Sequence, residues 1–251
     1  MVKVIKVGGG ILESEESTQA FLDAFCQIEG PKVLVHGGGR LATTIGERMG
    51  IKSQMIEGRR ITDEATLQIV TMVYGGLVNK NIVAKLQARG VNAIGLTGAD
   101  MNYMQASKRP PKNGIDYGYA GDVTKTNGEA LRQLLSMGMS PVIAPLTHDG
   151  KGLLLNTNAD TIAMETARSL APEAELIYCF GKAGILRDIN DPNSVIPTIT
   201  PELYKQLKEE GVISDGMIPK TDNAFNALQS GIKQVRITSY TQLDGGTVIK
   251  C

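Results

Sequence analysis

The chain has 251 residues, 42% of them hydrophobic, and its 26 lysines and arginines balance its 26 acidic residues. This length and composition provide a sizeable core for one large domain or two lobes, and a net charge of zero argues against a nucleic-acid partner or an anionic membrane surface. The three cysteines (Cys26, Cys179 and Cys251) are odd in number and widely spaced, which favours reduced thiols in a cytoplasmic protein over a disulfide framework or a metal site.

The first part of the chain alternates short apolar runs with amphipathic stretches. Val2–Val7 is rich in β-branched residues and ends in glycines, as is typical of a buried strand, and it begins too early to follow a signal peptide. A long helical pattern covers Asp63–Gln87, with an N-cap at Thr62 or Asp63, and Gly75-Gly76 interrupts it for what we expect to be a packing reason. The other elements expected here are helices over Thr18–Ile28 and Leu41–Met49 and strands over Val33–Val35 and Ala93–Leu96.

The second part opens with a turn-rich stretch. Residues 101–125 contain Pro110-Pro111 and Asn113-Gly114, which predict a hairpin excursion. The elements expected after it are helices over Glu129–Met137, Ala159–Leu170, Pro201–Glu210 and Met217–Ser230, and strands over Ser140–Pro145, Leu153–Asn156, Glu175–Cys179, Gln234–Thr238 and Thr247–Ile249. Repeated βα units predict an α/β fold, a three-layer αβα sandwich with an open, mainly parallel central sheet and ligands outside the carboxyl ends of its strands.

Two glycine-rich turns follow apolar runs, one over Lys6–Gly10 and one over His36–Arg40. Such turns expose backbone N–H groups to an anion, and a lysine adds a positive point charge. For Lys6, a snorkelling lysine before a flexible loop is an equally good interpretation. Neither turn has the spacing of a Walker A loop or of the dinucleotide fingerprint. We interpret His36 as a structural hydrogen-bonding residue rather than an acid–base catalyst, because phosphoryl transfer depends on positioning and charge.

Three further segments carry polar side chains. Gly58–Asp63 contains two arginines, a residue type that grips carboxylates, although for this segment alone a solvated basic turn is the better interpretation. In Asn156–Asp160, either asparagine fits a helix cap and Asp160 fits the helix dipole, while the functional interpretation is substrate binding and lysine orientation. Ser214–Lys220 begins a helix, and its lysine is either a surface residue or a second phosphate-binding charge.

Together these motifs resemble the amino-acid kinase family, most closely its members that phosphorylate an N-acylated glutamate in arginine biosynthesis. The order Lys-x-Gly-Gly, His-Gly-Gly-Gly, Gly-x-Arg-x-Thr, Asn-x-Asn-Ala-Asp, Asp-Gly-Met-x-x-Lys extends over nearly the whole chain and is specific jointly. The resemblance implies one amino-acid kinase domain over residues 1–251. Its N-lobe, about 1–173, would bind the acylglutamate and dimerise, and its C-lobe, about 174–251, would bind nucleotide, with a weak boundary near Ala171–Glu175.

The resemblance also implies an activity and a set of site residues. The chain would be a transferase that moves the γ-phosphoryl group of ATP to the γ-carboxylate of N-acetyl-L-glutamate or a related N-acylglutamate. Lys6 and Lys220 would neutralise the moving phosphoryl group and the leaving ADP, Asp160 would organise both lysines, and Gly9 and Gly38 would donate backbone N–H groups to the phosphoryl. The other implied contacts are Gly38, Gly39, Arg60 (for the α-carboxylate) and Asn156 with the substrate, and Gly181, Lys182, Ala183, Gly184, Ile185, Leu186, Val212, Ser214, Asp215, Gly216 and Met217 with the nucleotide. Mg²⁺ would be held mainly by ATP oxygens, without a metal site on the protein.

The sequence departs from the family pattern in three places. Phe180-Gly181-Lys182 stands where members usually have Ser/Thr-Asp-Val at the ribose, so an acid is missing and a lysine is present, and we expect nucleotide affinity or preference to differ. Lys108, Arg109 and Lys112 make the lid hairpin basic; a solvated loop explains this, and a sharper hypothesis is an acyl group with its own carboxylate, such as succinyl. No helical extension precedes the first strand, so we expect a homodimer, insensitive to arginine, paired through the long helix that contains Asn79-Lys80.

Two other functional classes stay open. One is a kinase of the same fold for another small anion, such as carbamate, aspartate, glutamate or uridylate, although the pattern of Arg60 and Asn156 argues against it. The other is a non-catalytic sensor that binds nucleotide or amino acid, which the altered ribose segment keeps in view. The joint presence of Lys6, Asp160 and Lys220 favours catalysis, because a binder does not need the full set of charges.

Overall fold

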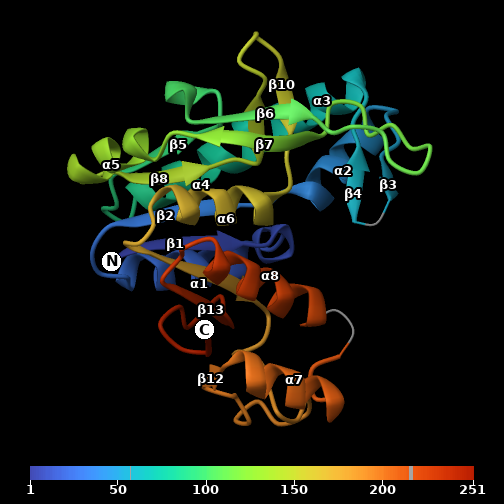
Figure 1. Cartoon of the computed structure of the whole chain (residues 1–251). Helices are drawn as coiled ribbons and strands as arrows, with labels where there is room; N and C mark the ends of the chain where they lie inside the picture. Colours follow the sequence, from blue (N-terminus) through green and yellow to red (C-terminus); the bar gives the residue numbers. More distant parts are fainter. Residues whose placement is uncertain (57, 215–216) are drawn as a thin grey trace.

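The structure, a computed structural model, describes residues 1–56, 58–214 and 217–251. Its main sheet has eight strands in the order β12-β14-β13-β11-β1-β2-β8-β5 (Figure 1). The pairs from β13 to β5 are parallel, and β14 runs antiparallel to β13, so the expected open, mainly parallel sheet is confirmed. The strands are β1 (Val2–Val7), β2 (Lys32–His36), β5 (Ala93–Leu96), β8 (Ser140–Ile143), β11 (Ala174–Phe180), β12 (Thr198–Ile199), β13 (Gln234–Ser239) and β14 (Thr247–Ile249).

Helices cover both faces of this sheet. Along β1, Val4 packs into one hydrophobic cluster and Ile5 into the other, as the two-residue period of a strand requires. The first cluster includes residues of α5 (Gly128–Ser136), α6 (Ala159–Ser169) and α8 (Ile218–Gln229). The second includes residues of α1 (Glu15–Gln27) and α4 (Asn79–Gln87). The three expected layers are therefore present, and none of the described helices has the length and apolar character needed to cross a bilayer.

A smaller sheet is formed by segments that follow the carboxyl ends of β5 and β8 in the chain, with the strand order β10-β9-β6-β7. Its strands are β6 (Met104–Lys108), β7 (Gly121–Thr126), β9 (Leu146–His148) and β10 (Leu154–Asn156). The antiparallel pairing of β6 with β7 matches the predicted hairpin excursion. The single strand expected over Ser140–Pro145 is wrong at its end, because the chain leaves the main sheet after Ile143 and enters the small sheet at Leu146.

The long helix predicted over Asp63–Gln87 is continuous but not uniform. It begins as α3 (Glu64–Val70), and the Asp63 side chain caps it by accepting a hydrogen bond from Thr66 N at 2.8 Å. A wider, π-helical stretch, η2 (Thr71–Val78), separates α3 from α4. Gly75-Gly76 lies within this stretch, where a Cβ on Gly75 would meet the side chain of Leu146 at 3.4 Å.

The structure contains a short hairpin of β3 (Gln54–Ile56) and β4 (Arg59–Ile61), where the sequence of Gly58–Asp63 favours a basic turn. Helix α1 begins three residues before the expected Thr18, because the Ser14 side chain caps it through Ser17 N at 3.1 Å. The remaining helical elements are η1 (Gly9–Leu12), α2 (Gly39–Arg48), η3 (Asp100–Asn102) and α7 (Pro201–Glu209).

The strands of the two expected lobes belong to one sheet, in which Val2 of β1 pairs with Ala174 of β11. The lobe boundary near residue 173 therefore remains a prediction.

Candidate active site

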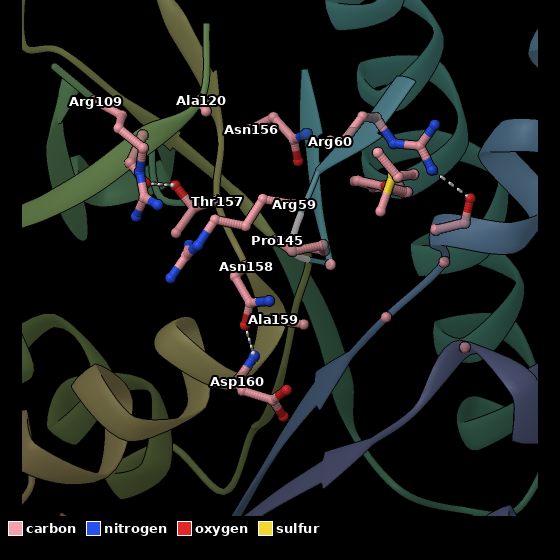
Figure 2. Close-up of a pocket in the computed structure, with 18 of the residues that line it drawn as sticks. Arg59, Arg60, Arg109, Ala120, Pro145, Asn156, Thr157, Asn158, Ala159 and Asp160 are labelled. Carbon is pink, nitrogen blue, oxygen red and sulfur yellow. Dashed lines mark hydrogen bonds between the residues drawn. The ribbon is translucent and has the colours of Figure 1, made fainter. Parts of the chain in front are cut away.

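A cavity of about 220 Å³ lies where β1 and β2 end and the small sheet begins (Figure 2). All seven residues expected around the phosphoryl group and the substrate on the N-terminal side line it: Lys6, Gly9, Gly38, Gly39, Arg60, Asn156 and Asp160. These residues come from both glycine turns, β4, β10 and α6. The cavity thus joins segments that are far apart in the sequence.

The two glycine turns meet at the base of this cavity. A Cβ on Gly9 would lie 3.1 Å from Gly38 N, and a Cβ on Gly37 would lie 2.9 Å from Gly9 N. Glycine is required because the two backbones approach so closely. Within the described residues, the N–H groups of Gly9 and Gly38 donate to no protein acceptor. These two N–H groups, unpaired within the described part of the chain, lie beside the cavity at the starts of η1 and α2 and form a site suited to an anion.

Lys6 forms an ion pair with Asp160. Its Nζ lies 2.9 Å from Oδ1 of Asp160, and the lysine side chain is 10% exposed whereas the carboxylate is 44% exposed. Lys6 is the fifth residue of β1, and Asp160 lies in the first turn of α6, whose N-cap is Asn158. The cap accepts from Asp160 N at 2.8 Å, which fixes the backbone that carries the carboxylate (Figure 2).

Arg60 and Arg59 extend in different directions from β4 (Figure 2). Arg60 is 7% exposed and points toward α2, where its Nη2 donates to Gly39 O at 2.8 Å and to Thr43 Oγ1 at 2.9 Å. It also contacts Ser53 through Nη1. Arg59 extends toward Asn158 across the cavity. The guanidinium of Arg60 is thereby held rigidly, with donors left for a ligand.

Asn156 ends β10 and does not cap α6, so of the two asparagines expected as caps only Asn158 is one. Its Nδ2 donates to Thr62 Oγ1 at 2.9 Å, and its backbone N donates to Tyr119 O in the hairpin loop at 2.9 Å. Among the described residues, its Oδ1 accepts no hydrogen bond and is available to a ligand.

Several further residues line the cavity, and among them Arg109 belongs to the basic hairpin that is expected to cover the acyl group. Arg109 of the basic hairpin lines the cavity and forms an ion pair with Asp122, with Nε at 3.1 Å from Oδ1. Lys108 and Lys112 do not line it, and Lys108 Nζ instead lies 3.9 Å from the ring centroid of Tyr119. The other residues missed are Gly37, Met55, Gly58, Arg59, Tyr74, Ala120, Gly121, Pro145, Thr157, Asn158 and Ala159. The arginines belong to basic segments, and Gly37, Gly58 and the residues between Asn156 and Asp160 belong to motifs already described. Nothing in the sequence marks the remaining contributors, which are Met55, Tyr74, Ala120, Gly121 and Pro145.

A second cavity, of about 560 Å³, opens between the loop after β11 and the loop after α7. Of the expected nucleotide contacts, the residues that line it are Lys182, Gly184, Ile185, Leu186, Val212, Ser214 and Met217. Gly181 and Ala183 do not line it, and Asp215 and Gly216 lie outside the described residues. The lining residues not predicted are Arg187, Asp188, Ile189, Glu210 and Gly211.

Lys220 lies on α8 with its Nζ 4.0 Å from the centroid of the Phe180 ring. Burial and the positive charge of Lys6 lower its pKa, and the charge of Asp160 partly offsets this. The charges of Lys6 and Asp160 therefore both influence the pKa of Lys220. Asp160 pairs directly with Lys6, and Lys220 rests on an aromatic face, a favourable place for a cation.

Comparison with known proteins places this geometry in context. The model of the amino acid kinase family matches residues 1–239. The chain is 58% identical to the acetylglutamate kinase of Phocaeicola vulgatus over 251 residues, which cover 98% of this chain and 97% of that protein.

Two solved structures are also similar. The N-acetylglutamate synthase of Neisseria gonorrhoeae, complexed with coenzyme A and N-acetyl-glutamate, is 25% identical with a TM-score of 0.81, over 100% of this chain and 59% of that one. The carbamate kinase of Giardia lamblia bound to AMP-PNP is 14% identical with a TM-score of 0.67, over 99% of this chain and 97% of that one, and shows the fold alone.

Proposed function

The chain belongs to the amino acid kinase family, and from this premise we propose that it transfers the γ-phosphoryl group of ATP to the γ-carboxylate of N-acetyl-L-glutamate, the activity named for its relatives. It is thus a phosphotransferase with a carboxyl group as acceptor and serves arginine biosynthesis. The observation that carries the proposal is the cavity at the ends of β1 and β2, which combines cationic side chains with backbone N–H groups that have no acceptor among the described residues.

The charges of this cavity suit an acceptor with two carboxylates. Lys6, Arg59, Arg60 and Arg109 line it, and Asp160 is the one acid among the described lining residues. Because Asp160 is already paired with Lys6, the ammonium group of a free amino acid would have no acidic partner there and would face arginines. An N-acylated amino acid carries a neutral amide instead. Its N–H suits the unoccupied Oδ1 of Asn156, so the site favours acylated glutamate over free glutamate.

Phosphoryl transfer then follows from charge. The acceptor carboxylate is ionised at neutral pH, so it needs no general base to attack the γ-phosphorus in line. Two anions must approach each other, and Lys6 with the Gly9 and Gly38 N–H groups stabilises the negative charge on the phosphoryl oxygens. Lys220 neutralises the leaving ADP, and the second cavity holds the nucleotide between the loops after β11 and α7.

Mg²⁺ is expected to enter the site on the phosphate oxygens of ATP, where it neutralises part of their charge. The described residues include no group of three or more His, Cys, Asp or Glu side chains that could hold a metal ion. Lys6 and Lys220 therefore have to supply the protein's share of the positive charge near the phosphates.

A coupled assay of ADP release, with ATP, Mg²⁺ and a panel of acceptors, tests the function. We expect N-acetyl-L-glutamate to support turnover, and free glutamate, aspartate and carbamate to give little. Turnover with one of those anions and not with acylated glutamate would replace the proposal by another kinase of this fold. Nucleotide or acylglutamate binding without any ADP release would identify a sensor.

One observation favours a second acceptor, N-succinyl-L-glutamate. Arg109 extends into the cavity from the hairpin loop, as a cation for a third carboxylate would (Figure 2). Its pairing with Asp122 weakens this case, because that carboxylate already occupies two of its donors. The ratio of kcat/KM for the succinyl and acetyl substrates decides between them. If the succinyl group binds Arg109, then Arg109→Gln lowers the succinyl value selectively, whereas Lys112→Gln, outside the cavity, leaves the ratio unchanged.

For assembly, we propose a homodimer paired through the continuous helix 64–87. Met72 and Leu77 are exposed on its π-helical stretch, at 51% and 46%. Exposed apolar side chains on a rigid helix favour self-association through a two-fold axis. Asn79 does not take part in such a face, because it is 1% exposed and directed inward.

A further inference from the structure

His36 is a fully buried titratable residue that the transfer step does not use. It ends β2 directly before the second glycine turn, and its side chain is 0% exposed. Nδ1 lies 2.7 Å from Gly37 O, and Nε2 lies 3.1 Å from Nδ2 of Asn79. Both ring nitrogens are therefore engaged, one with the glycine turn and one with α4.

Asn79 determines which nitrogen of His36 carries the proton. Asn79 Nδ2 also lies 2.9 Å from Val142 O, which accepts only, so this atom must be the amide nitrogen and not the oxygen. An amide nitrogen donates to Nε2, which leaves Nε2 as an acceptor and places the ring proton on Nδ1. The Nδ1–H group then donates to Gly37 O.

The hydrogen bond from His36 to Gly37 O orients the whole Gly37–Gly38 peptide group. Gly37 O and Gly38 N belong to one planar trans peptide, in which the C=O and N–H vectors point in opposite directions. A ring that holds the carbonyl on the core side therefore turns the Gly38 N–H away from the core. That N–H is one of the two unpaired donors at the cavity, and glycines on both sides give this peptide unusual freedom to rotate.

We propose that His36 is a positioning residue, which, as a neutral imidazole oriented by Asn79, holds the Gly37–Gly38 peptide so that the Gly38 N–H faces the transferred phosphoryl group. It does not touch the substrate and moves no proton. The proposal rests on the function proposed above, and it extends that function by naming what orients one of its backbone donors. Helix α4 is thereby connected to the transfer site through two side chains.

Three variants separate this role from simple packing. His36→Asn keeps an amide donor near the position of Nδ1. His36→Gln carries its amide farther out, near the position of Nε2, and His36→Leu keeps only bulk. Turnover is measured at saturating ATP, Mg²⁺ and N-acetyl-L-glutamate, and each KM is measured by varying one substrate while the other is saturating. Thermal unfolding reports whether each variant is folded.

We expect His36→Asn to retain kcat within a few-fold, and His36→Gln and His36→Leu to lose about 10²-fold in kcat with little change in either KM, because misdirecting an oxyanion donor acts on the transition state. Equal kcat values for the Asn and Gln variants, or losses that follow the unfolding temperature alone, would overturn the proposal. Absence of turnover in the unmodified protein would instead overturn the proposed function.

The ring ¹⁵N shifts of His36 provide a test that requires neither activity nor a variant. We expect a protonated Nδ1 and an unprotonated Nε2 at neutral pH, and the opposite tautomer or an imidazolium would refute the positioning role even if every variant failed to fold. On addition of MgADP, N-acetyl-L-glutamate and aluminium fluoride as a phosphoryl mimic, the Gly38 amide resonance should shift in the unmodified protein. The same addition should shift it much less in His36→Gln.

Discussion

Lys6 and Asp160 hold each other across the junction of β1 and α6, with Nζ 2.9 Å from Oδ1. The pair sets a nearly buried lysine at the cavity where the phosphoryl group is proposed to pass, and it leaves the more exposed carboxylate to influence Lys220 as well.

Replacing Lys6 should affect chemistry more than binding. Lys6→Met is expected to lower kcat by about 10²–10³-fold, since a charge aimed at the transition state is lost, with a much smaller change in KM for the acceptor. Lys3→Met is the matched control, because Lys3 lies on the same strand and pairs with an exposed Asp244 at 2.6 Å. Steady-state kinetics of ADP release measure both. Near-normal turnover in Lys6→Met would remove this lysine from the mechanism.

Replacing Asp160 should change the pH dependence of activity through Lys220. The pKa of Lys220 is lowered by burial and by Lys6, while Asp160 raises it. In Asp160→Asn the raising influence is gone, so Lys220 loses its proton at lower pH than before. The alkaline limb of the kcat/KM profile should therefore move to lower pH. In Lys6→Met the alkaline limb should move to higher pH, because the charge that lowers the pKa of Lys220 is gone. If the alkaline limb stays in place in both variants, Lys220 is not the group that titrates.

The two neighbouring glycines of the first turn should differ in their tolerance of a methyl group. In Gly9→Ala the new Cβ would lie 3.1 Å from Gly38 N, so the two turns must separate and their N–H groups diverge. In Gly10→Ala it would lie 3.7 Å from the flexible Arg40 guanidinium, an ordinary contact. We expect a fall in kcat of at least about tenfold for Gly9→Ala only, and similar values for the two variants would contradict the close meeting of the turns.

The free energy of unfolding should depend on pH because His36 is buried in the folded protein. Burial lowers its pKa from 6.5 to about 4, and the bond to Gly37 O opposes this only in part. Below pH 6.5 the unfolded chain binds a proton that the folded protein does not, so the free energy of unfolding falls as the pH is lowered toward 4. The slope due to this residue approaches about 1.4 kcal/mol per pH unit. Urea titrations of the unmodified protein and of His36→Asn should differ by this slope, and parallel curves would show that the imidazole is not buried in solution.

Self-association should depend on the π-helical stretch. Leu77→Glu places a charge on the proposed dimer face and is expected to yield monomers in sedimentation velocity. Met137→Glu is the control, since Met137 is 64% exposed at the end of α5, away from that helix. An unchanged sedimentation coefficient for Leu77→Glu would refute pairing through this face.

Much of the main sheet could be predicted because its strands are strongly patterned. Val2–Val7 is a nearly continuous apolar run that is buried on both faces of the sheet. Asp63 is a residue type favoured at helix N-caps, and it caps α3. The hairpin of β3 and β4 could not be predicted, since each strand has three residues and little alternation. The polar residues of this hairpin give the segment around Arg59 and Arg60 the sequence pattern of a turn.

The site could be predicted from the sequence where charged side chains occur in motifs with a known chemical role. Lys6, Arg60 and Asp160 are charges in recognisable motifs, and all three line one cavity. The wall of the second cavity formed by Arg187–Ile189 and Glu210 was missed, because it depends on how the loop after β11 packs against the end of α7. The role of Asn79 was hidden for the same reason, since it follows only from the long-range contact with His36.

Across the connection from β10 to α6, Asn156 at the end of β10, the proposed acceptor contact, and Asp160 in the first turn of α6, the partner of Lys6, are only four positions apart in the sequence. A shift of Asn156 to suit a different acceptor would displace Asp160 as well. During divergence of this lineage, new acceptor preferences should therefore arise on the opposite wall, in the hairpin loop and β4, while this connection stays constant. The proposed nucleotide site lies in a separate cavity, so a change in its lining residues can alter nucleotide preference without displacing the proposed acceptor contacts.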